Sequence, residues 1–369
     1  MASTVINLSS RLPISNSKFN TIVLAAGFGT RFKPHTEILP KPVFPFLNNP
    51  FLFYSTHLAE YLITTKLVIN THHLPTKIKE LVIRIVPPTC ASIKSARYYF
   101  LDEDPIILGS AGGIKNAEGH LKGNGNFLTL NADSAFWPSD FNFFRNLQSK
   151  HMQEGALATL ALIEHPGVGT LYNAVWINAI GEVVGMGKQP PLGVKVQKGL
   201  HFTGMQWLSD DVFDLIPYGK ACDIFRDILL PQIAQGKKVL GHEVKGHWFE
   251  AGSLEIYLAD TKRALDLLNN QDPRSLLNFN SNDYVHSIFS RLWRNFEKRE
   301  YILEKVSGAQ VLRGHDSTID PTAELSGFVI LGEGVNVPAG CALHNTVINS
   351  GVVLPADFAA VDSLVLATP

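Results

Sequence analysis

The chain has 369 residues and a mass of 40.6 kDa, enough for two domains or for one large domain with an appendage. Hydrophobic residues make up 45% of it and charged residues 18%, which excludes a disordered protein. The formal net charge of −1 gives no overall field that would attract nucleic acid or acidic lipid. We therefore expect neither nucleic acid nor a membrane as a partner, and any anion site must be local.

The cysteines and the N-terminal segment predict a cytoplasmic protein. Cys90, Cys222 and Cys341 are odd in number, far apart and not in a CxxC arrangement, which argues against a disulfide framework or a zinc site. Residues 1–18 are polar and lack the apolar core of a signal peptide, so we expect a flexible tail. No run reaches the roughly 18 apolar residues of a membrane helix.

Strand-like and helix-like runs alternate from Thr21 onward. Short apolar runs predict strands, and runs with helical spacing predict helices, in the order strand 21–26, helix 51–63, strand 66–70, helix 74–86, strand 126–133, helix 140–152, and strands 156–165 and 182–188. This order predicts a mostly parallel α/β sheet covered on both faces. Binding sites in such sheets lie at the carboxyl ends of strands, so LAAG (24–27) and LNAD (130–133) could face one crevice.

The pattern changes twice in the C-terminal third. Residues 262–279 and 283–305 have helical spacing, and we expect a helical linker over 266–310. From 311 onward, small and branched residues recur every six positions, which is typical of a parallel β-helix; an ordinary meander is the alternative, but it would slip within one or two repeats. The positions are Ala323, Val329, Val335, Cys341, Val347, Val353 and Ala359. So short a β-helix should cap, dock or mediate oligomerisation.

The stretch VLAAGFGTRFKPHTEILPKPVFP (23–45) can be read in two ways. Gly27 and Gly29 allow positive φ and close backbone approach, so their amides could point at an anion. Arg31 offers a planar fork to phosphate, and Lys41 is held between two prolines. The alternative is a strand, a tight turn and a basic surface loop. A third glycine and the GK[ST] triplet are both missing, which excludes a dinucleotide fingerprint and a P-loop.

Residues 24–45 resemble the signature of the sugar-1-phosphate nucleotidyltransferases, roughly LAAGxGTRxxPxTxxxPKPxxP. Further segments resemble that family in the expected order: ILGSAGGI (107–114), LNADS (130–134), GMGKQP (185–190), FTGMQWLS (202–209) and GHWFEAGSLEIYLAD (246–260). The resemblance covers roughly residues 20–265. Within the family, the chain most resembles the mannose-1-phosphate guanylyltransferase and N-acetylmuramate-1-phosphate uridylyltransferase branches.

The resemblance implies a Rossmann-like, mostly parallel sheet of the nucleotide-diphospho-sugar transferase type, followed by a left-handed parallel β-helix. Its domains would be a tail (1–18), a nucleotidyltransferase domain (19–265), a helical linker (266–310) and hexapeptide repeats (311–369). The implied reaction transfers a nucleoside monophosphate from an NTP, GTP or UTP, to a sugar-1-phosphate and releases pyrophosphate. Such products serve cell-envelope polysaccharides. The implied cofactor is Mg²⁺, and a homo-oligomer could form through the repeats.

The resemblance also assigns roles to residues. Catalysis would rest on Arg31, which holds the β- and γ-phosphates, and on Lys41, which lies on the α-phosphate. The metal ligands would be Asp133 and Glu250. The nucleotide-binding set is Leu24, Ala25, Ala26, Gly27, Gly29, Thr30, Glu103 and Gly109. The sugar-binding set is Asn173, Lys188, Gly204 and Trp248.

The chain departs from the family pattern at the second carboxylate. The family has aspartate where this chain has Glu250, and the extra methylene moves the carboxylate by more than about 1 Å, which Mg²⁺ tolerates poorly. Three readings stay open: an altered metal site, a glutamate that binds the metal through water, or a weakened, regulatory protein. Ala132, Ser110, Ser253 and Asn173 also differ from the usual residues, and they bear on sugar identity more than on the chemistry.

Several residues have simpler readings. His72 and His73 could fill a loop, since adjacent histidines after a strand do not face one metal ion. Trp248 could belong to the hydrophobic core, Lys188 could be an exposed loop residue, and Asp133 could cap the end of a strand. Two rival functions remain beside the transferase. One is a nucleotide-binding regulatory protein without turnover. The other is an acyltransferase built on the repeats with His344, for which the coils look too few.

Overall fold

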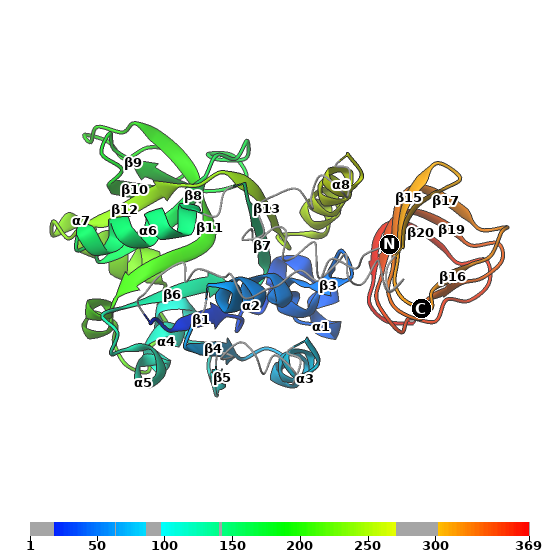
Figure 1. Cartoon of the computed structure of the whole chain (residues 1–369), viewed down its shortest axis with the longest axis horizontal. Helices are drawn as coiled ribbons and strands as arrows, with labels where there is room; N and C mark the ends of the chain where they lie inside the picture. The colour runs from blue at the N-terminus through cyan, green and yellow to red at the C-terminus, as the bar shows by residue number, and fades with distance from the viewer. Residues whose placement is uncertain (1–17, 63, 86–96, 140–141, 271–301, 369) are drawn as a thin grey trace, which may run out of the picture.

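The computed structural model describes residues 18–62, 64–85, 97–139, 142–270 and 302–368 (Figure 1). The predicted N-terminal tail, apart from Lys18, and most of the predicted linker lie outside these residues. No helix of the described residues is long and apolar enough to cross a membrane.

The central sheet is mixed, whereas the sequence predicted a mostly parallel one. Its parallel half has the order β6-β1-β4-β5, and a second half is attached through β11, where all pairs are antiparallel except the parallel pair of β8 and β12. The parallel strands are β1 (Thr21–Leu24), β4 (Lys66–Thr71), β5 (Arg97–Asp102) and β6 (Asn126–Asn131). The others are β8 (Ala158–Ile163), β9 (Ala174–Ile177), β10 (Val183–Gly187), β11 (Lys198–Ser209) and β12 (Val239–Glu243). The prediction failed because no helix separates β8, β9, β10 and β11, and parallel neighbours need a crossover.

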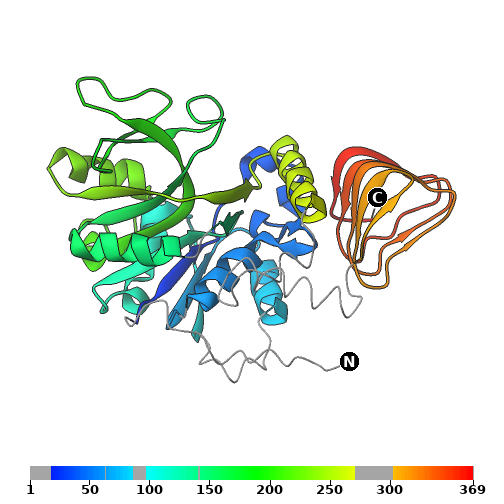
Figure 2. The same cartoon turned by 45° about the horizontal axis from the view of Figure 1, so that its top comes forward.

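Helices cover both faces of this sheet (Figures 1 and 2). Along β1, Ile22 and Val23 are both fully buried and belong to different apolar clusters, one on each face, as expected for a strand covered on both sides. The helices are α1 (His35–Ile38), α2 (Phe51–Tyr61), α3 (Pro75–Ile85), α4 (Gly109–Asn116), α5 (Glu118–Leu121), α6 (Asn142–Gln153), α7 (Leu230–Ala234) and α8 (Leu254–Asn270). Shorter helical turns are η2 (Thr30–Phe32), η3 (Lys41–Val43), η4 (Asp210–Asp214) and the π-helix η5 (Ile224–Leu229).

The C-terminal residues coil into stacked parallel strands with a triangular outline (Figure 2). Their strands are β15 (Ala309–Arg313), β16 (Thr318–Ile319), β17 (Glu324–Leu331), β18 (Asn336–Val337), β19 (Ala342–Ile348) and β20 (Ala359–Val365). Val311 pairs with Val329, 18 residues later, so three six-residue repeats make one coil. The predicted period is therefore present in the first coils.

The six-residue frame slips at the third coil, which the sequence pattern did not predict. Ser326 pairs with His344 at an offset of 18, but Val329 pairs with Thr346 at an offset of 17, with an irregularity around Gly327 in between. Consequently Val347 turns outward and joins the apolar cluster of the α/β domain, and Val353 is 67% exposed. A one-residue shift moves every later side chain to the other face of its strand.

The strands of this domain also begin earlier than predicted. β14 (Ile302–Val306) pairs antiparallel with β15, through a two-residue turn in which Ser307 and Gly308 both have positive φ. The helical reading of residues 302–310 was therefore wrong, because the Ser-Gly hairpin signal outweighs the helical spacing. Upstream, α8 is described up to Asn270, and residues 271–301 of the predicted linker lie outside the described residues.

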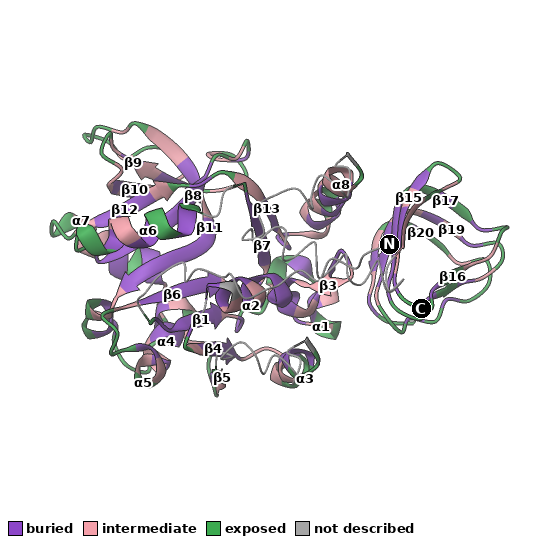
Figure 3. Ribbon diagram, viewed as in Figure 1, coloured by how far each residue is buried: buried purple, intermediate pink, exposed green. Residues whose placement is uncertain are grey.

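The coiled domain packs directly on the α/β domain. Outward-facing side chains of its strands join the apolar cluster that contains β1 and α8. The Asn48 side-chain amide donates to the Leu331 carbonyl at 3.0 Å, and Gln310 donates to Asp266 of α8 at 2.7 Å. Figure 3 shows buried residues on the strands that face α8. Asn48 lies in the turn of the short hairpin formed by β2 (Pro45–Phe46) and β3 (Asn49–Pro50), a few residues after Lys41.

Candidate active site

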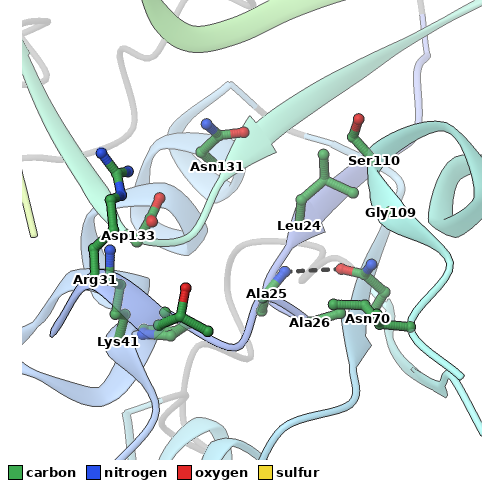
Figure 4. Close-up of a pocket in the computed structure, with 15 residues that line it drawn as sticks. Leu24, Ala25, Ala26, Arg31, Lys41, Asn70, Gly109, Ser110, Asn131 and Asp133 are labelled. Atoms are coloured by element: carbon green, nitrogen blue, oxygen red, sulfur yellow. Dashed lines mark hydrogen bonds between the residues drawn. The ribbon is translucent and has the colours of Figure 1, made fainter. Parts of the chain in front are cut away.

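A pocket of about 370 Å³ opens at the carboxyl ends of β1 and β6 (Figure 4). The two strand ends that the sequence placed in one crevice both line it. Its lining consists of Leu24, Ala25, Ala26, Gly27, Gly29, Thr30, Arg31, Lys41, Pro42, Asn70, Ile107, Gly109, Ser110, Asn131 and Asp133. All but one of the predicted nucleotide-binding residues are in this set, together with both predicted catalytic residues and one predicted metal ligand.

Residues 25–29, between β1 and η2, form the loop of the family signature and are called the signature loop below. Its two glycines, Gly27 and Gly29, have different structural roles. Gly29 has φ of +62° and precedes η2, and a Cβ there would lie 2.9 Å from Cγ of Lys41 and from Thr36. Gly27 does not take positive φ, and a Cβ there would meet nothing within 4 Å. Gly29 therefore sets the turn and lets Lys41 approach, whereas Gly27 leaves space in the pocket.

Lys41 is a buried cation at one end of the pocket. Only 6% of it is exposed, and it begins η3 directly after Pro40. Burial lowers the pKa of its ammonium group; the nearby Asp133 and Glu250 carboxylates oppose that shift, and Arg31 adds to it. The folded chain thus brings four charges into mutual range from sequence positions that are far apart. Figure 4 shows Arg31, Lys41 and Asp133 gathered on one side of the pocket.

The strand pair β7 (Ser134–Pro138) and β13 (Gly246–Glu250) places the two acidic residues. Glu250 pairs with Ser134 in the antiparallel register, and the Ala251 amide donates to the Asp133 carbonyl at 3.1 Å. The Glu250 amide in turn donates to Asp260 of α8 at 2.8 Å. Burial raises the pKa of Glu250, the Tyr172 hydroxyl lowers it by hydrogen bonding, and Asp133 raises it further.

These two carboxylates fit a hard divalent cation. Oε1 of Glu250 is buried and has no hydrogen-bond partner. A cation bound at that atom would give this buried polar atom the partner it lacks. Among the described residues, no group of three or more His, Cys, Asp or Glu side chains is placed to hold a metal ion. Mg²⁺ often takes only one or two protein carboxylates and completes its shell with water and substrate phosphates, which matches this donor set.

A hydrogen-bonded relay builds the opposite wall. Asn70 Oδ1 accepts from the Ala25 amide at 2.8 Å (Figure 4). Its Nδ2 donates to Glu103 Oε1 at 2.6 Å. Glu103 Oε2 accepts from the Leu108 amide at 2.6 Å. Glu103, predicted to bind nucleotide, is therefore buried behind the pocket, and both of its oxygens already serve the protein. Through Asn70, Glu103 connects the 103–109 loop to the loop that follows β1.

Sequence reasoning missed Asn70 and Asn131. Both are pocket-lining amides at the carboxyl ends of parallel strands, β4 and β6. The signal was available, because polar residues at strand ends point to a site in this kind of sheet. The predicted strands 66–70 and 126–133 contained them, but neither residue was selected.

The predicted sugar-binding residues lie apart from the main pocket. Gly204, with φ of +87°, packs against Asn131 and lines a separate cavity of about 20 Å³. Trp248 is buried and donates from Nε1 to the Thr203 carbonyl at 3.0 Å. Asn173 is exposed, and the exposed Lys188 donates to the Thr170 carbonyl. The structure does not bring these four residues together in one cavity.

The histidine pair is held by two different backbone groups. His72 Nδ1 lies 2.6 Å from the Glu103 carbonyl, and His73 Nε2 lies 2.6 Å from the Thr36 carbonyl. The exposed ring of Phe28 makes an edge contact with His72, with ring centroids 5.0 Å apart. The loop-filling reading of these histidines agrees with these contacts.

Comparisons with known proteins cover the same part of the chain. The family model described as "Nucleotidyl transferase" matches residues 20–266. A mannose-1-phosphate guanyltransferase of Kluyveromyces lactis is 24% identical over 259 residues, spanning 69% of this chain and 67% of the relative. A probable mannose-1-phosphate guanylyltransferase 2 of Arabidopsis thaliana is 25% identical over the same shares.

Solved structures support the fold. A UDP-glucose pyrophosphorylase complexed with UDP-glucose aligns with a TM-score of 0.55 at 19% identity, covering 68% of this chain and 99% of that one. HddC from Yersinia pseudotuberculosis aligns with a TM-score of 0.53 at 19% identity, covering 67% of this chain and 99% of that one. At this level of identity the likeness establishes the fold of the first two thirds of the chain.

Proposed function

Because the chain belongs to the nucleotidyl transferase family, we propose that it transfers a nucleoside monophosphate from an NTP to a sugar-1-phosphate, giving an NDP-sugar and pyrophosphate. The observation that carries the proposal is the grouping of charged residues: Arg31, Lys41 and Asp133 line the pocket, and Glu250 lies within electrostatic range of all three. Those residues supply cations for phosphate and carboxylates for a metal ion.

The chemistry requires positioning and charge more than it requires a base. The attacking sugar phosphate is already an anion, so the barrier comes from bringing two polyanions together and from the charge that develops at the α-phosphorus. A buried, poorly hydrated ammonium such as that of Lys41 interacts strongly with that charge. Arg31 is exposed at the pocket edge, where its planar fork can hold the leaving β- and γ-phosphates.

Asp133 and Glu250 would hold Mg²⁺ in this scheme. A bound Mg²⁺ supplies charge neutralisation and a template for the phosphate oxygens. The β7–β13 pairing sets the separation of the two carboxylates, and the Asp260 contact fixes the backbone of Glu250. The backbone of the signature loop would cradle the nucleotide, and the Asn70–Glu103 relay would keep the two loops of the nucleotide side in register.

For the substrate pair, we favour a guanine nucleotide and mannose-1-phosphate. The two curated relatives described above carry that activity in their names. UTP stays the second choice for the nucleotide, since a UDP-glucose pyrophosphorylase shares the fold.

Pyrophosphate release tests the proposal directly. GTP, UTP, CTP, ATP and dTTP are each incubated with Mg²⁺ and a set of hexose-1-phosphates, using wild type and Asp133→Ala. We expect release with at least one pair and its loss in Asp133→Ala. Nucleotide binding without release from any pair would favour the second candidate, a regulatory homologue, which the longer Glu250 side chain suggests.

For the C-terminal domain we propose a left-handed parallel β-helix that docks on α8 and promotes oligomerisation. β20 is the last strand of its sheet in the described residues, and Val361 on it is 63% exposed. An open strand edge with an apolar residue is suited to pairing with a second copy. Light scattering of wild type and Val361→Lys tests this, with a smaller assembly expected for the variant.

An acyltransferase role for these coils has little support. His344 Nε2 lies 2.9 Å from the side-chain amide nitrogen of Asn345, so it accepts there, and its Nδ1 must carry the proton. That Nδ1 therefore donates to Ser326 Oγ at 2.8 Å. With its proton on Nδ1, His344 cannot act as a base towards Ser326. The contacts among Ser326, His344 and Asn345 are therefore structural.

A further inference from the structure

The side of the pocket opposite the charged residues is formed by the start of α4. Figure 4 shows Gly109 and Ser110 on one side of the pocket, and Arg31 and Lys41 on the other. Gly109 and Ser110 begin α4, and both line the pocket. Residues 107–111 are called the α4 wall below. If the charged side takes the triphosphate of an NTP, the nucleoside lies against the α4 wall.

A segment that is remote in the sequence holds the α4 wall by its backbone. The Cys222 amide donates to the Leu108 carbonyl at 2.9 Å, and the Cys222 carbonyl accepts from the Ala111 amide at 3.0 Å. Gly109 has φ of +69°, and a Cβ there would lie 2.6 Å from the Cys222 carbonyl oxygen, so the close approach requires glycine. The position of the α4 wall therefore depends on the residues that directly precede η5.

Two side chains complete this contact. Ser110 Oγ accepts from the Ile224 amide at 2.8 Å and donates to Asp223 Oδ2 at 3.0 Å. The single hydroxyl proton of Ser110 is therefore used within the protein and is not available to a nucleobase. The other oxygen, Asp223 Oδ1, accepts from the Phe225 and Arg226 amides at 3.0 and 2.8 Å, which makes Asp223 the N-cap of η5.

We infer that Asp223 is a positioning residue that fixes the α4 wall for the nucleoside of the NTP, acting through the hydroxyl of Ser110. The inference rests on the proposed function. One carboxylate joins two elements, because Oδ1 is held at the start of η5 while Oδ2 holds Ser110. The carboxylate cannot turn away from Ser110 without also uncapping η5, so the first turn of α4 keeps one position.

This placement predicts a selective effect on the substrate. Arg31 and Lys41, which would take the phosphates, lie on the other side of the pocket (Figure 4). Loss of the contact between Asp223 and Ser110 should therefore weaken recognition of the nucleoside and leave recognition of the phosphates unchanged. The KM for NTP should rise, while the KM for sugar-1-phosphate should stay the same.

A comparison of nucleotide with inorganic tripolyphosphate tests the inference. Tripolyphosphate has the phosphate chain of an NTP without the nucleoside. Calorimetric titration with Mg²⁺ measures the binding of tripolyphosphate and of a non-hydrolysable GTP analogue, or of a UTP analogue if wild type binds only that nucleotide. We expect about tenfold weaker nucleotide binding by Asp223→Ser, because a hydrogen bond to a charged group is lost. Tripolyphosphate binding should stay within about twofold of wild type.

The variants separate positioning from capping. Serine at position 223 still offers an N-cap acceptor to η5, but its side chain is too short to reach Ser110. Ser110→Ala should weaken nucleotide binding as Asp223→Ser does, and Ser110→Thr, which keeps the hydroxyl, should bind as wild type does. Asp211→Ser is the matched control, because Asp211 is exposed on η4.

A double-mutant cycle tests whether Asp223 acts through Ser110. In a Ser110→Ala background, Asp223→Ser should change nucleotide binding by less than about twofold, since the contact is already lost. Thermal unfolding shows whether each variant is folded. If Asp223→Ser does not fold, Ser110→Ala and Ser110→Thr still test the inference, because they leave the N-cap of η5 intact.

The outcomes separate the inference from the proposed function. Nucleotide binding by Asp223→Ser and Ser110→Ala equal to that of wild type would overturn the inference and leave the transferase intact. An equal loss of nucleotide and tripolyphosphate binding would also overturn it, since the effect would not be confined to the nucleoside. A wild-type protein that neither binds a nucleotide analogue nor releases pyrophosphate would overturn the proposed function itself.

Discussion

The side-chain amide of Asn70 donates a 2.6 Å hydrogen bond to the Glu103 carboxylate, and this contact joins the two loops that form the nucleotide side of the pocket. Asn70 also accepts from Ala25 in the signature loop, and Glu103 also accepts from Leu108 in the loop that precedes α4. Every donor and acceptor in this relay has a fixed direction. A change of one acceptor into a donor should therefore disturb both loops.

Glu103→Gln tests the relay with the smallest possible change. Both partners of Glu103 are donors, so the new amide nitrogen must face one of them and leave it unsatisfied. We expect a loss of about 1–3 kcal/mol in the free energy of unfolding. The KM for NTP should rise while the KM for sugar-1-phosphate changes little. Urea unfolding and steady-state kinetics measure the two effects.

Glu80→Gln is the control for this variant, because Glu80 is exposed on α3. It should behave as wild type in both measurements. If Glu103→Gln proves as stable and as active as Glu80→Gln, the relay does not hold the loops in place.

Lys41→Met should separate catalysis from stability. Methionine keeps the volume of the buried stem and removes the charge at the α-phosphate, so we expect pyrophosphate release to fall by about 10²- to 10³-fold. The free energy of unfolding should stay level or rise, because a poorly hydrated ammonium group is replaced by an apolar one. Lys33→Met at an exposed position is the control. Activity within about tenfold of wild type would refute the role given to Lys41.

Most of the residues that line the pocket were selected from the sequence, for identifiable reasons. Gly27, Gly29, Arg31 and Lys41 lie close together in one segment whose glycines and prolines restrict the backbone, so local chemistry was informative. Asp133 was selected through the resemblance of LNADS to a family motif, and the rule that the carboxyl ends of parallel strands meet at one edge placed its segment beside residues 24–27. The hexapeptide period likewise predicted the coiled strands up to Cys341.

What the sequence left out depends on contacts between distant segments. Glu103 was assigned to the nucleotide, because nothing in its own segment indicates that Asn70 and Leu108 take both of its oxygens. The antiparallel pairs of the sheet were missed for a related reason. The direction of strand pairing follows from connection lengths, and the segment after β8 was interpreted only in part.

Gly29→Ala and Gly27→Ala form a matched pair in the signature loop. At Gly29 the substitution adds left-handed backbone strain of roughly 1–2 kcal/mol. It also places a methyl 2.9 Å from the Lys41 stem, so stability and turnover should both fall. At Gly27 the methyl meets nothing within 4 Å, so stability should be unchanged while the KM for NTP rises. Thermal unfolding and nucleotide titration distinguish the two. A stable, active Gly29→Ala would show that the positive φ is not required.

His151 should make the fold sensitive to mild acid. It is buried on α6, Nδ1 lies 2.9 Å from Thr159 Oγ1, and Nε2 lies 2.9 Å from Asn126 Oδ1. Burial lowers the pKa of His151 from 6.5 to about 4, so between these values the unfolded chain binds the proton and the folded chain does not. Stability is therefore full above pH 6.5 and is lost as the pH falls towards 4. At about pH 5 the loss from this residue is about 2 kcal/mol.

His151→Gln removes this titration while keeping a side chain that can hydrogen-bond. The variant should be less stable than wild type near neutral pH, because its packing is less well matched, but its urea midpoint should fall less between about pH 7 and about pH 5. His201 has a pKa that burial also lowers to about 4, so part of the acid sensitivity will persist in the variant. Equal pH slopes for wild type and His151→Gln would mean that His151 is already protonated in the fold, or that it opens to solvent before the protein unfolds.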